Sequence, residues 1–226
     1  MKKFGLVILV LVIVCFFCYV SCNSNDKNEQ LTLLNGKLLT IEPGDHWQGR
    51  MKLFLFFSMR KTPQFAIWIE NNQGDYISTV FATGKSAKNN WQSAPKEGRP
   101  ETLPVWNHKR IINLEQIDIV SSATPKGAVN IQIDNSSLIE GQEYNIYLEI
   151  NHSFDYNNFW TESNSGVNGQ PSLIYHAIFV AGVTERINLT PIGHGSIDGS
   201  NGNIVNDLKT LTTALTIIND VYIFRK

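Results

Sequence analysis

The fold of this 226-residue chain is predicted most clearly by the segment YNIYLEIN, Tyr144–Asn151. Its apolar and mostly polar residues alternate, which places Ile146, Leu148 and Ile150 on one face. A period of two is typical of a β-strand that is buried on one side only. Residues 129–133, VNIQI, repeat the pattern. Both segments therefore predict half-buried strands that pack against a core.

Further strands are predicted on both sides of these two. Phe65–Glu70 and Tyr76–Phe81 flank the turn-forming residues 71–75, NNQGD, and this arrangement predicts a hairpin. Leu53–Phe57 is a short continuous apolar run, which predicts a central strand covered on both faces. The remaining predicted strands are Leu173–Val180, Ile187–Thr190, Leu211–Ile217 and Val221–Phe224.

Many short strands without long alternating helices predict an all-β fold. We expect an antiparallel β-sandwich of the immunoglobulin or fibronectin type. Leu114–Val120, with Asn113 as its N-cap, is the best helix candidate, so we expect at most one short helix. Thr83–Arg110 and Ser153–Gln170 are too long for tight turns and contain several aromatic residues, so we expect two ordered, functional loops.

The first 21 residues have the layout of a lipoprotein signal peptide. Two lysines precede the apolar run Phe4–Val20. Residues 20–22, VSC, resemble the end of a bacterial lipobox, although Tyr19 stands where that pattern has leucine. The resemblance implies cleavage before Cys22 and attachment of a diacylglycerol to its thiol. An uncleaved anchor helix is the alternative, because the run is close to the ~20 residues that span a bilayer.

The leader also predicts how the rest of the chain is organised. Residues 22–30 form a polar tether after the cysteine, and residues 31–226 are expected to form a single β-sandwich domain. With either form of the leader, the domain lies on the far side of the membrane. We therefore expect an exported, membrane-anchored protein of the bacterial cell envelope that faces the periplasm or the cell surface.

Composition excludes several classes of protein. The leader holds two of the 19 basic residues and none of the 20 acidic ones, so the mature chain has a net charge of about −3. Lys and Arg do not gather in any segment, and nucleic-acid binding, which needs a basic face, is excluded. Cys15 and Cys18 leave with the leader, and Cys22 carries the lipid. A disulfide scaffold, a thiolate zinc site and a cysteine nucleophile are therefore excluded.

Three segments resemble a family of bacterial envelope proteins. They are PQFAIWIENNQGDYISTVFATG (63–84), RPETLPVW (99–106) and SSATPKG (121–127). Their order resembles the hairpin, LP-x-W and ATPK motifs of the predicted periplasmic proteins of the domain of unknown function 2271 family. The resemblance covers roughly residues 50–150. It implies a β-sandwich in the envelope and supplies no activity.

One turn resembles a site of covalent flavin attachment. The segment from Asp118 to Lys126, DIVSSATPK, is similar to the D-x-x-S/T-G-A-T-x-T/S sequence of flavin-carrying domains, with Ser121 and Thr124 at matching positions. In that family the second hydroxyl residue receives FMN through a phosphoester bond. Lys126 stands at the acceptor position and has no hydroxyl, so ordinary attachment cannot occur there. We favour a structural turn that leads into the strand at Ala128.

A second candidate site lies in the segment 194–207, which is rich in Asn, Asp, Ser and Gly. Oxygen-rich loops of this kind suit Ca²⁺, but the register of an EF-hand fails. Asp198, Asn201 and Asp207 remain candidates for a calcium site of another geometry. The alternative, which we favour, is a connecting loop rich in turn formers.

Aromatic residues of the two long loops are candidate contacts for a partner protein or a flat ligand. We select Trp91, Tyr156 and Trp160, whereas we expect Trp106 to fold inward. The sequence contains no G-x-S-x-G, H-E-x-x-H or phosphate-loop motif, and its five histidines are dispersed. No catalytic residues are therefore assigned, and a binding role is favoured over an enzyme.

Three hypotheses for function follow. The first is a membrane-tethered, non-enzymatic binding or assembly module, without a cofactor, that binds an envelope protein or a small ligand through its loops. The second is an accessory component of an envelope flavin or electron-transfer system. The third is a calcium- or metal-dependent domain that uses residues 193–207.

Overall fold

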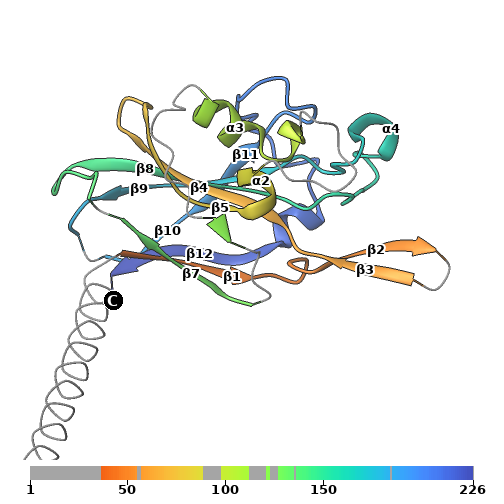
Figure 1. Ribbon diagram of the computed structural model, residues 1–226, viewed down its shortest axis with the longest axis horizontal. Coiled ribbons are helices and arrows are strands. Elements are labelled where there is room, and N and C mark those ends of the chain that lie inside the picture. Colours follow the sequence, from red (N-terminus) through yellow and green to blue (C-terminus); the bar gives the residue numbers. More distant parts are fainter. Residues whose placement is uncertain are drawn as a thin grey trace, which may run out of the picture. The chain divides into compact units, whose positions relative to one another are not determined.

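A computed structural model describes residues 37–54, 57–88, 98–111, 121–122, 127–134, 136–183 and 185–225 (Figure 1). Lys37–Arg225 forms one compact unit. Several predictions concern residues outside the described ranges: the leader, Cys22, the tether, Trp91, Asp118, Thr124, Lys126 and the helix over 114–120. Among the described residues, no helix is long and apolar enough to cross a bilayer.

Two β-sheets face each other in this unit. The smaller sheet has the order β10 (Ile187–Asn188), β12 (Ile218–Arg225), β1 (Lys37–Pro43), β7 (Val129–Ile133), and all its pairs are antiparallel. The larger sheet has the order β11 (Thr190–His194), β9 (Leu173–Val180), β8 (Glu143–Asn151), β4 (Gln64–Asn71), β5 (Tyr76–Thr83), β6 (Ser121–Ser122). Only β6 pairs in parallel. The predicted all-β sandwich is confirmed.

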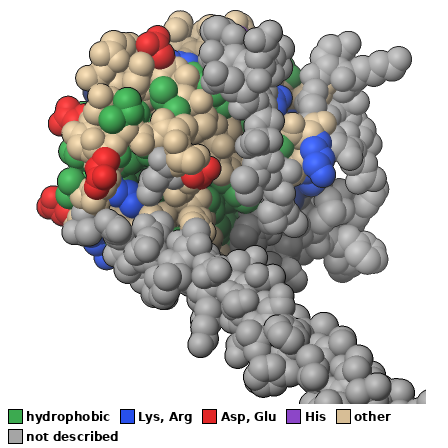
Figure 2. Space-filling model, turned by 60° about the vertical axis from the view of Figure 1, so that its left-hand side comes forward, with side chains coloured by type: hydrophobic (Ala, Val, Ile, Leu, Met, Phe, Trp, Pro, Cys, Tyr) green, Lys and Arg blue, Asp and Glu red, His purple; other side chains and the backbone are tan. Residues whose placement is uncertain are grey.

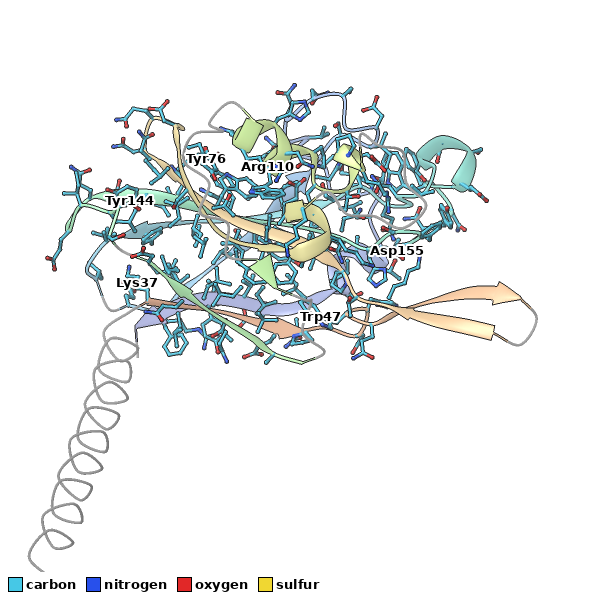
Figure 3. All side chains as sticks on the ribbon, viewed as in Figure 1. Lys37, Trp47, Tyr76, Arg110, Tyr144 and Asp155 are labelled. Atoms are coloured by element: carbon cyan, nitrogen blue, oxygen red, sulfur yellow. The ribbon has the colours of Figure 1, made fainter. Side chains whose placement is uncertain are left out.

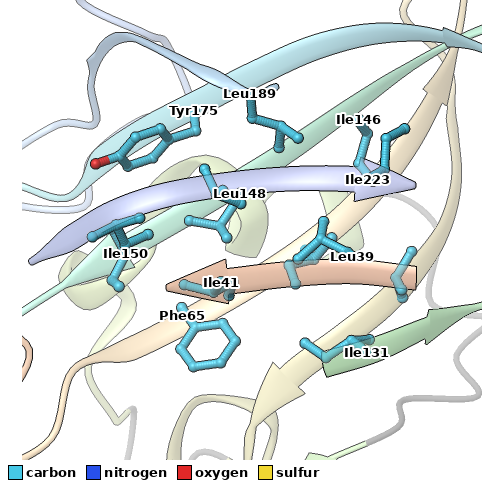
Figure 4. Close-up of a cluster of buried hydrophobic side chains, with 14 of the residues drawn as sticks. Leu39, Ile41, Phe65, Ile131, Ile146, Leu148, Ile150, Tyr175, Leu189 and Ile223 are labelled. Carbon is cyan, nitrogen blue, oxygen red and sulfur yellow. The ribbon is translucent and has the colours of Figure 1, made fainter. Parts of the chain in front are cut away.

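The main core lies between the two sheets, and strand alternation explains its composition (Figure 4). In β8, Ile146, Leu148 and Ile150 are fully buried in this core, as their period of two predicts. Leu39 and Ile41 of the smaller sheet meet them from the opposite side (Figure 4). Burial of large aliphatic side chains, each contributing roughly 1.5–3 kcal/mol, is therefore the main source of stability.

A third layer covers the outer face of the larger sheet. It includes α2 (Gly84–Lys88), the 3₁₀ helix η1 (Pro100–Thr102) and α3 (Pro104–Ile111). Its second, smaller core contains Trp68 from β4 and the fully buried Trp106 from α3. The inward position predicted for Trp106 is confirmed.

The helix content corrects the prediction of at most one short helix. The described residues contain three, since α4 (Glu162–Ser165) joins α2 and α3. The longest, α3, begins with Pro104, which is favoured in a first turn. Its free N–H groups at Val105 and Trp106 donate to the carboxylate of Glu149 on β8. A cap from a distant strand leaves no local sequence signal.

Two predicted strands are also corrected. The apolar run Leu53–Phe57 is not a central strand: it is divided between β2 (Gly49–Phe54) and β3 (Phe57–Lys61), a hairpin that forms a two-stranded sheet of its own. Leu211–Ile217 contains the 3₁₀ helix η3 (Thr213–Thr216). Its buried residues, Leu211, Ala214 and Ile217, recur every third position, which matches a 3₁₀ helix rather than a strand.

The strand order gives the sandwich two different ends. At the short-turn end, strands are joined by residues 72–75, 134–142 and 181–186. At the long-loop end lie the β2–β3 hairpin, the connection 152–172 and η3, whereas α3 extends over the outer face of the larger sheet and reaches Gly74 of the β4–β5 turn through Lys109. Figure 3 shows Lys37 and Tyr144 at the first end and Asp155 at the second.

Candidate functional site

The loop 153–170 at the long-loop end is ordered by its own backbone hydrogen bonds. The N–H of Phe154 donates to the carbonyl of Val167 (2.9 Å). Asp155 pairs with Gly169 as an isolated parallel bridge, and the N–H of Gln170 donates to the carbonyl of Asp155 (2.8 Å). The two ends of the loop are thus hydrogen-bonded to each other.

Buried polar side chains fasten this loop to η3. Nε2 of Gln170 donates to Oδ2 of Asp155 at 2.8 Å, and the hydroxyl of Thr213 donates to Oδ1 of the same carboxylate at 2.5 Å. Oε1 of Gln170 accepts the N–H of Thr212 at 2.6 Å. Burial raises the pKa of Asp155 above its ordinary value. Because Gln170 is almost fully buried, these bonds hold the loop in one position.

Arg99 fastens the loop from the opposite side. Its guanidinium donates to the hydroxyl of Ser153 (2.8 Å) and to Oδ1 of Asn168 (3.1 Å), and it pairs with Glu101 at 2.9 Å. Nδ2 of the fully buried Asn168 donates in turn to the carbonyl of Glu101 at 2.6 Å. The sequence gives no indication of this network, because its members come from three separate segments.

The fastened loop exposes aromatic rings. Phe154, Tyr156 and Phe159 are 36%, 37% and 55% exposed. Tyr156 keeps its ring at the surface while its hydroxyl donates to the carbonyl of Gly166. Trp160 is partly buried against the main core, and its indole N–H donates to the hydroxyl of Thr210. Tyr156 thus keeps an exposed ring, as a contact residue requires, whereas Trp160 has a largely structural position.

Phe154 is the residue that sequence reasoning missed. Its φ of +62° is the only positive value at a non-glycine residue in the described chain. A bulky residue in this region costs roughly 1–2 kcal/mol, and such costs are concentrated at functional sites. No sequence pattern predicts a left-handed phenylalanine, so no signal could have found it.

Lys61, the last residue of β3, lies directly on this ring. Its ammonium is 3.4 Å from the centroid of Phe154, within the range of a cation–π interaction. Burial, followed by the positive charges of Arg99 and Lys85, lowers the pKa of Lys61 to about 8. A partly desolvated ammonium thus lies on an aromatic ring and is subject to the positive charges of two further side chains.

His152 holds the base of the β2–β3 hairpin against the loop. Its Nε2 lies 3.0 Å from both the backbone N of Gly49 and the carbonyl of Lys61. In one tautomer Nε2 accepts the Gly49 N–H, and in the other it donates to the Lys61 carbonyl. Burial lowers the pKa of His152 and so favours the neutral ring. A Cβ at residue 49 would overlap the imidazole, so only glycine fits there.

The predicted metal loop uses its oxygens for its own turns. Oδ1 atoms of Asp198, Asn201 and Asp207 each accept the backbone N–H two residues later, at 2.9–3.0 Å. Hydrogen bonds from Ser200 lower the pKa of Asp198. Across the described residues, no three His, Cys, Asp or Glu side chains come together as a metal site. These contacts explain the composition of the loop, and calcium binding stays a prediction.

Of the four candidate positions in the flavin-like turn, only Ser121 falls within the described residues. It forms β6 with Ser122 and pairs in parallel with Ala82 of β5. The other three positions, Asp118, Thr124 and Lys126, lie outside, so the flavin hypothesis also stays a prediction.

Glu149 is a buried carboxylate whose hydrogen bonds hold parts of the fold together. Its oxygens accept from the hydroxyl of Ser172 (2.6 Å) and from the backbone N–H groups of Val105 (3.2 Å) and Trp106 (2.8 Å). Burial raises the pKa of Glu149 to about 7. The side chain is fully buried, so it anchors α3 and is not offered to a ligand.

The short-turn end contains an open depression of about 540 Å³. It is bounded by the β4–β5 turn and the connection before β8, with Asn71, Gln73, Ile77, Ile139, Gln142 and Tyr144 among its lining residues. Figure 2 views the molecule toward this end and shows carboxylates spread among uncharged and apolar side chains. In contrast to the fastened loop, it presents no cluster of exposed rings.

Comparison of the chain with protein-family models, curated proteins and solved structures finds no match in any of the three. The resemblance to the domain of unknown function 2271 family therefore stays a prediction from its motifs.

Proposed function

We propose that this protein is a non-enzymatic recognition module that is held at a bacterial membrane through Cys22 and binds a partner or ligand with its long-loop end. The observation that carries the proposal is the set of exposed rings, Phe154, Tyr156 and Phe159, on a loop whose backbone is fastened from both sides. Preorganised aromatic residues lose little entropy on binding and dominate interface hot spots.

The direction of β1 supports the same proposal. The chain enters the sandwich at Lys37, at the short-turn end, where the Lys37 ammonium donates to the carbonyl of Val180. The exposed rings lie at the other end of the strands. A module tethered in this way presents its recognition surface away from the point of attachment.

Site-specific photo-crosslinking in cells tests the proposal. A photoreactive amino acid replaces Asn158, which is exposed within the loop, and, as a matched control, Gln142, which is exposed at the short-turn end. We expect an adduct from position 158 that decreases at least about fivefold when Tyr156→Ala and Phe159→Ala are added, and none from position 142. An adduct at position 158 that persists when Tyr156→Ala and Phe159→Ala are added would contradict the proposal. So would an adduct that forms only at position 142.

The anchor is tested separately by intact mass spectrometry of the native protein. We expect the mass of a chain that begins at Cys22 and carries acyl groups. A full-length, unmodified mass in the membrane fraction would refute the lipoprotein assignment. The same spectrum would show a covalent flavin, which the second hypothesis requires.

A further inference from the structure

The arrangement around Lys61 points to the chemistry of the ligand. In the part of the chain that the structure describes, ion pairs join Arg99 to Glu101, Lys109 to Glu70 and Arg186 to Asp220. No described carboxylate pairs with Lys61 or with Lys85, whose charge acts on Lys61. The positive charges of Lys85 and of Arg99, the second of which is paired with Glu101, therefore act on an ammonium with which no described carboxylate pairs, although like charges repel.

We propose that Lys61 is the recognition residue of an anion site at the base of the β2–β3 hairpin, and that the site binds the phosphate of a phosphomonoester whose apolar body rests on Phe154 and Tyr156. This inference rests on the proposed function, because it names the ligand class for the same end of the sandwich. A dianion matches two uncompensated ammonium groups better than a monoanion does.

The groups of the proposed site are in contact with their neighbours. The Lys61 carbonyl lies against His152, and the Lys61 ammonium is 3.4 Å from the centroid of Phe154. The rings of Phe154 and Tyr156 are 6.5 Å apart and nearly perpendicular, so they form two walls of an angled apolar surface. The left-handed backbone of Phe154 sets the position of the first wall. Backbone strain at Phe154 and charge repulsion at Lys61 are thus both present where the anion would bind.

Binding should be linked to protonation of Lys61. The free ammonium has a pKa of about 8, and a bound anion stabilises its charged form. Affinity should therefore be full below pH 8 and should decrease above it. The charged groups that act on Lys61 are Arg99 before η1 and Lys85 on α2. His152, with its pKa below the ordinary 6.5, is neutral throughout the range from pH 7 to 9.5.

Calorimetric titration of the full chain in detergent with phenyl phosphate tests the proposal, because this probe stays a dianion above pH 7, its second pKa being about 6. We expect millimolar binding at pH 7 that weakens at least about tenfold at pH 9.5. Lys61→Gln should abolish binding at both pH values. Lys61→Arg, which keeps its charge, should bind at both without the pH dependence.

Further probes identify the ligand class. Inorganic phosphate, which has no apolar body, should bind more weakly than phenyl phosphate, and so should benzoate, which has one charge. Methyl phenyl phosphate, a diester like a phospholipid headgroup, should also bind more weakly. Equal binding of the diester or of benzoate would overturn the phosphomonoester assignment. Lys209→Gln, at an exposed lysine of another loop, serves as the control and should change nothing.

Unchanged binding in Lys61→Gln, or no binding of phenyl phosphate to a folded wild-type chain, would overturn the anion site itself. Circular dichroism of each variant verifies the fold. If the crosslinking adduct at position 158 depends on Tyr156 and Phe159 while phenyl phosphate does not bind, this inference is refuted and the proposed function is unaffected.

Discussion

The two ends of the sandwich are formed by the same strands but are closed by different means. At the short-turn end, hairpin geometry is sufficient: the β4–β5 turn is closed by Asn71, whose side chain accepts two backbone N–H groups. At the long-loop end, closure depends on buried side chains such as Gln170, Asn168 and Glu149, each bonded to a distant segment. Local turns require few specific residues, whereas long ordered loops require a network. Among the described residues, the large aromatic side chains that are exposed lie at the networked end.

The largest expected effect comes from Glu149, the buried anchor at the networked end. Its pKa is about 7 in the folded chain against 4.5 for the ordinary group, so the folded state keeps a proton that the unfolded state releases. Stability should therefore fall as the pH rises from about 5 to 8, by about 3 kcal/mol. Urea unfolding at several pH values measures this decrease.

Glu149→Gln should remove that pH dependence, since its side chain does not titrate. Glu143→Gln, on the same strand but exposed at the short-turn end, is the matched control and should change stability by less than about 0.5 kcal/mol. An unchanged pH profile in Glu149→Gln would show that the buried carboxylate does not distinguish the two ends.

Gln170→Ala should have the next largest effect. It removes hydrogen bonds to Asp155, Thr213 and Thr212 and leaves buried groups unsatisfied, so a loss of about 2–3 kcal/mol is expected. Gln142→Ala, at the exposed short-turn end, should cost less than about 0.5 kcal/mol. Chemical denaturation of both variants measures the loss of unfolding free energy at each end. Equal losses would contradict a stabilising role of the hydrogen-bond network around Gln170.

Phe154 sharpens the comparison through backbone strain. Glycine adopts its φ of +62° without penalty, so Phe154→Gly should be more stable than Phe154→Ala by about 1 kcal/mol. Both variants should lose the binding of phenyl phosphate because the ring is gone. If Phe154→Ala unfolds at a higher temperature than Phe154→Gly, the backbone strain assigned to Phe154 is wrong.

The smallest effect is expected at the depression of the short-turn end. Ile139 is 61% exposed, and Ile139→Ser should change stability by less than about 0.5 kcal/mol and leave crosslinking at Asn158 intact. Loss of the adduct in this variant would indicate that the depression at the short-turn end, and not the long-loop end, is the recognition surface.

How far the sequence predicts the fold depends on whether a signal is local. The alternation in β8 predicts its buried face correctly because each residue reports only on its own strand. The apolar run Leu53–Phe57 misleads, since continuous apolar residues look alike in a buried strand and in the β2–β3 hairpin. The prediction of a strand at Leu211–Ile217 is wrong because its buried positions recur every three residues.

The candidate site is less accessible to such reasoning. Composition selects the loop 153–170 and Tyr156, because aromatic residues in a long polar segment are a local feature. Lys61 and Phe154 meet across 93 positions of sequence, and the left-handed backbone that places the ring has no sequence signature. Likewise, Glu149 acts as the cap of α3 from another strand. These pairings arise from the topology of the sheets.

The placement of β1 has a mechanical consequence. Its seven residue pairs with β12 and five with β7 run from the entry at Lys37 toward the long-loop end. If the lipid holds one end and a bound ligand the other, a pulling force runs along these strands. The interstrand hydrogen bonds, which are perpendicular to the strands, are then loaded together in shear instead of being unzipped one at a time. With that anchor and that ligand, β1, an interior strand of the smaller sheet, would carry the force between them.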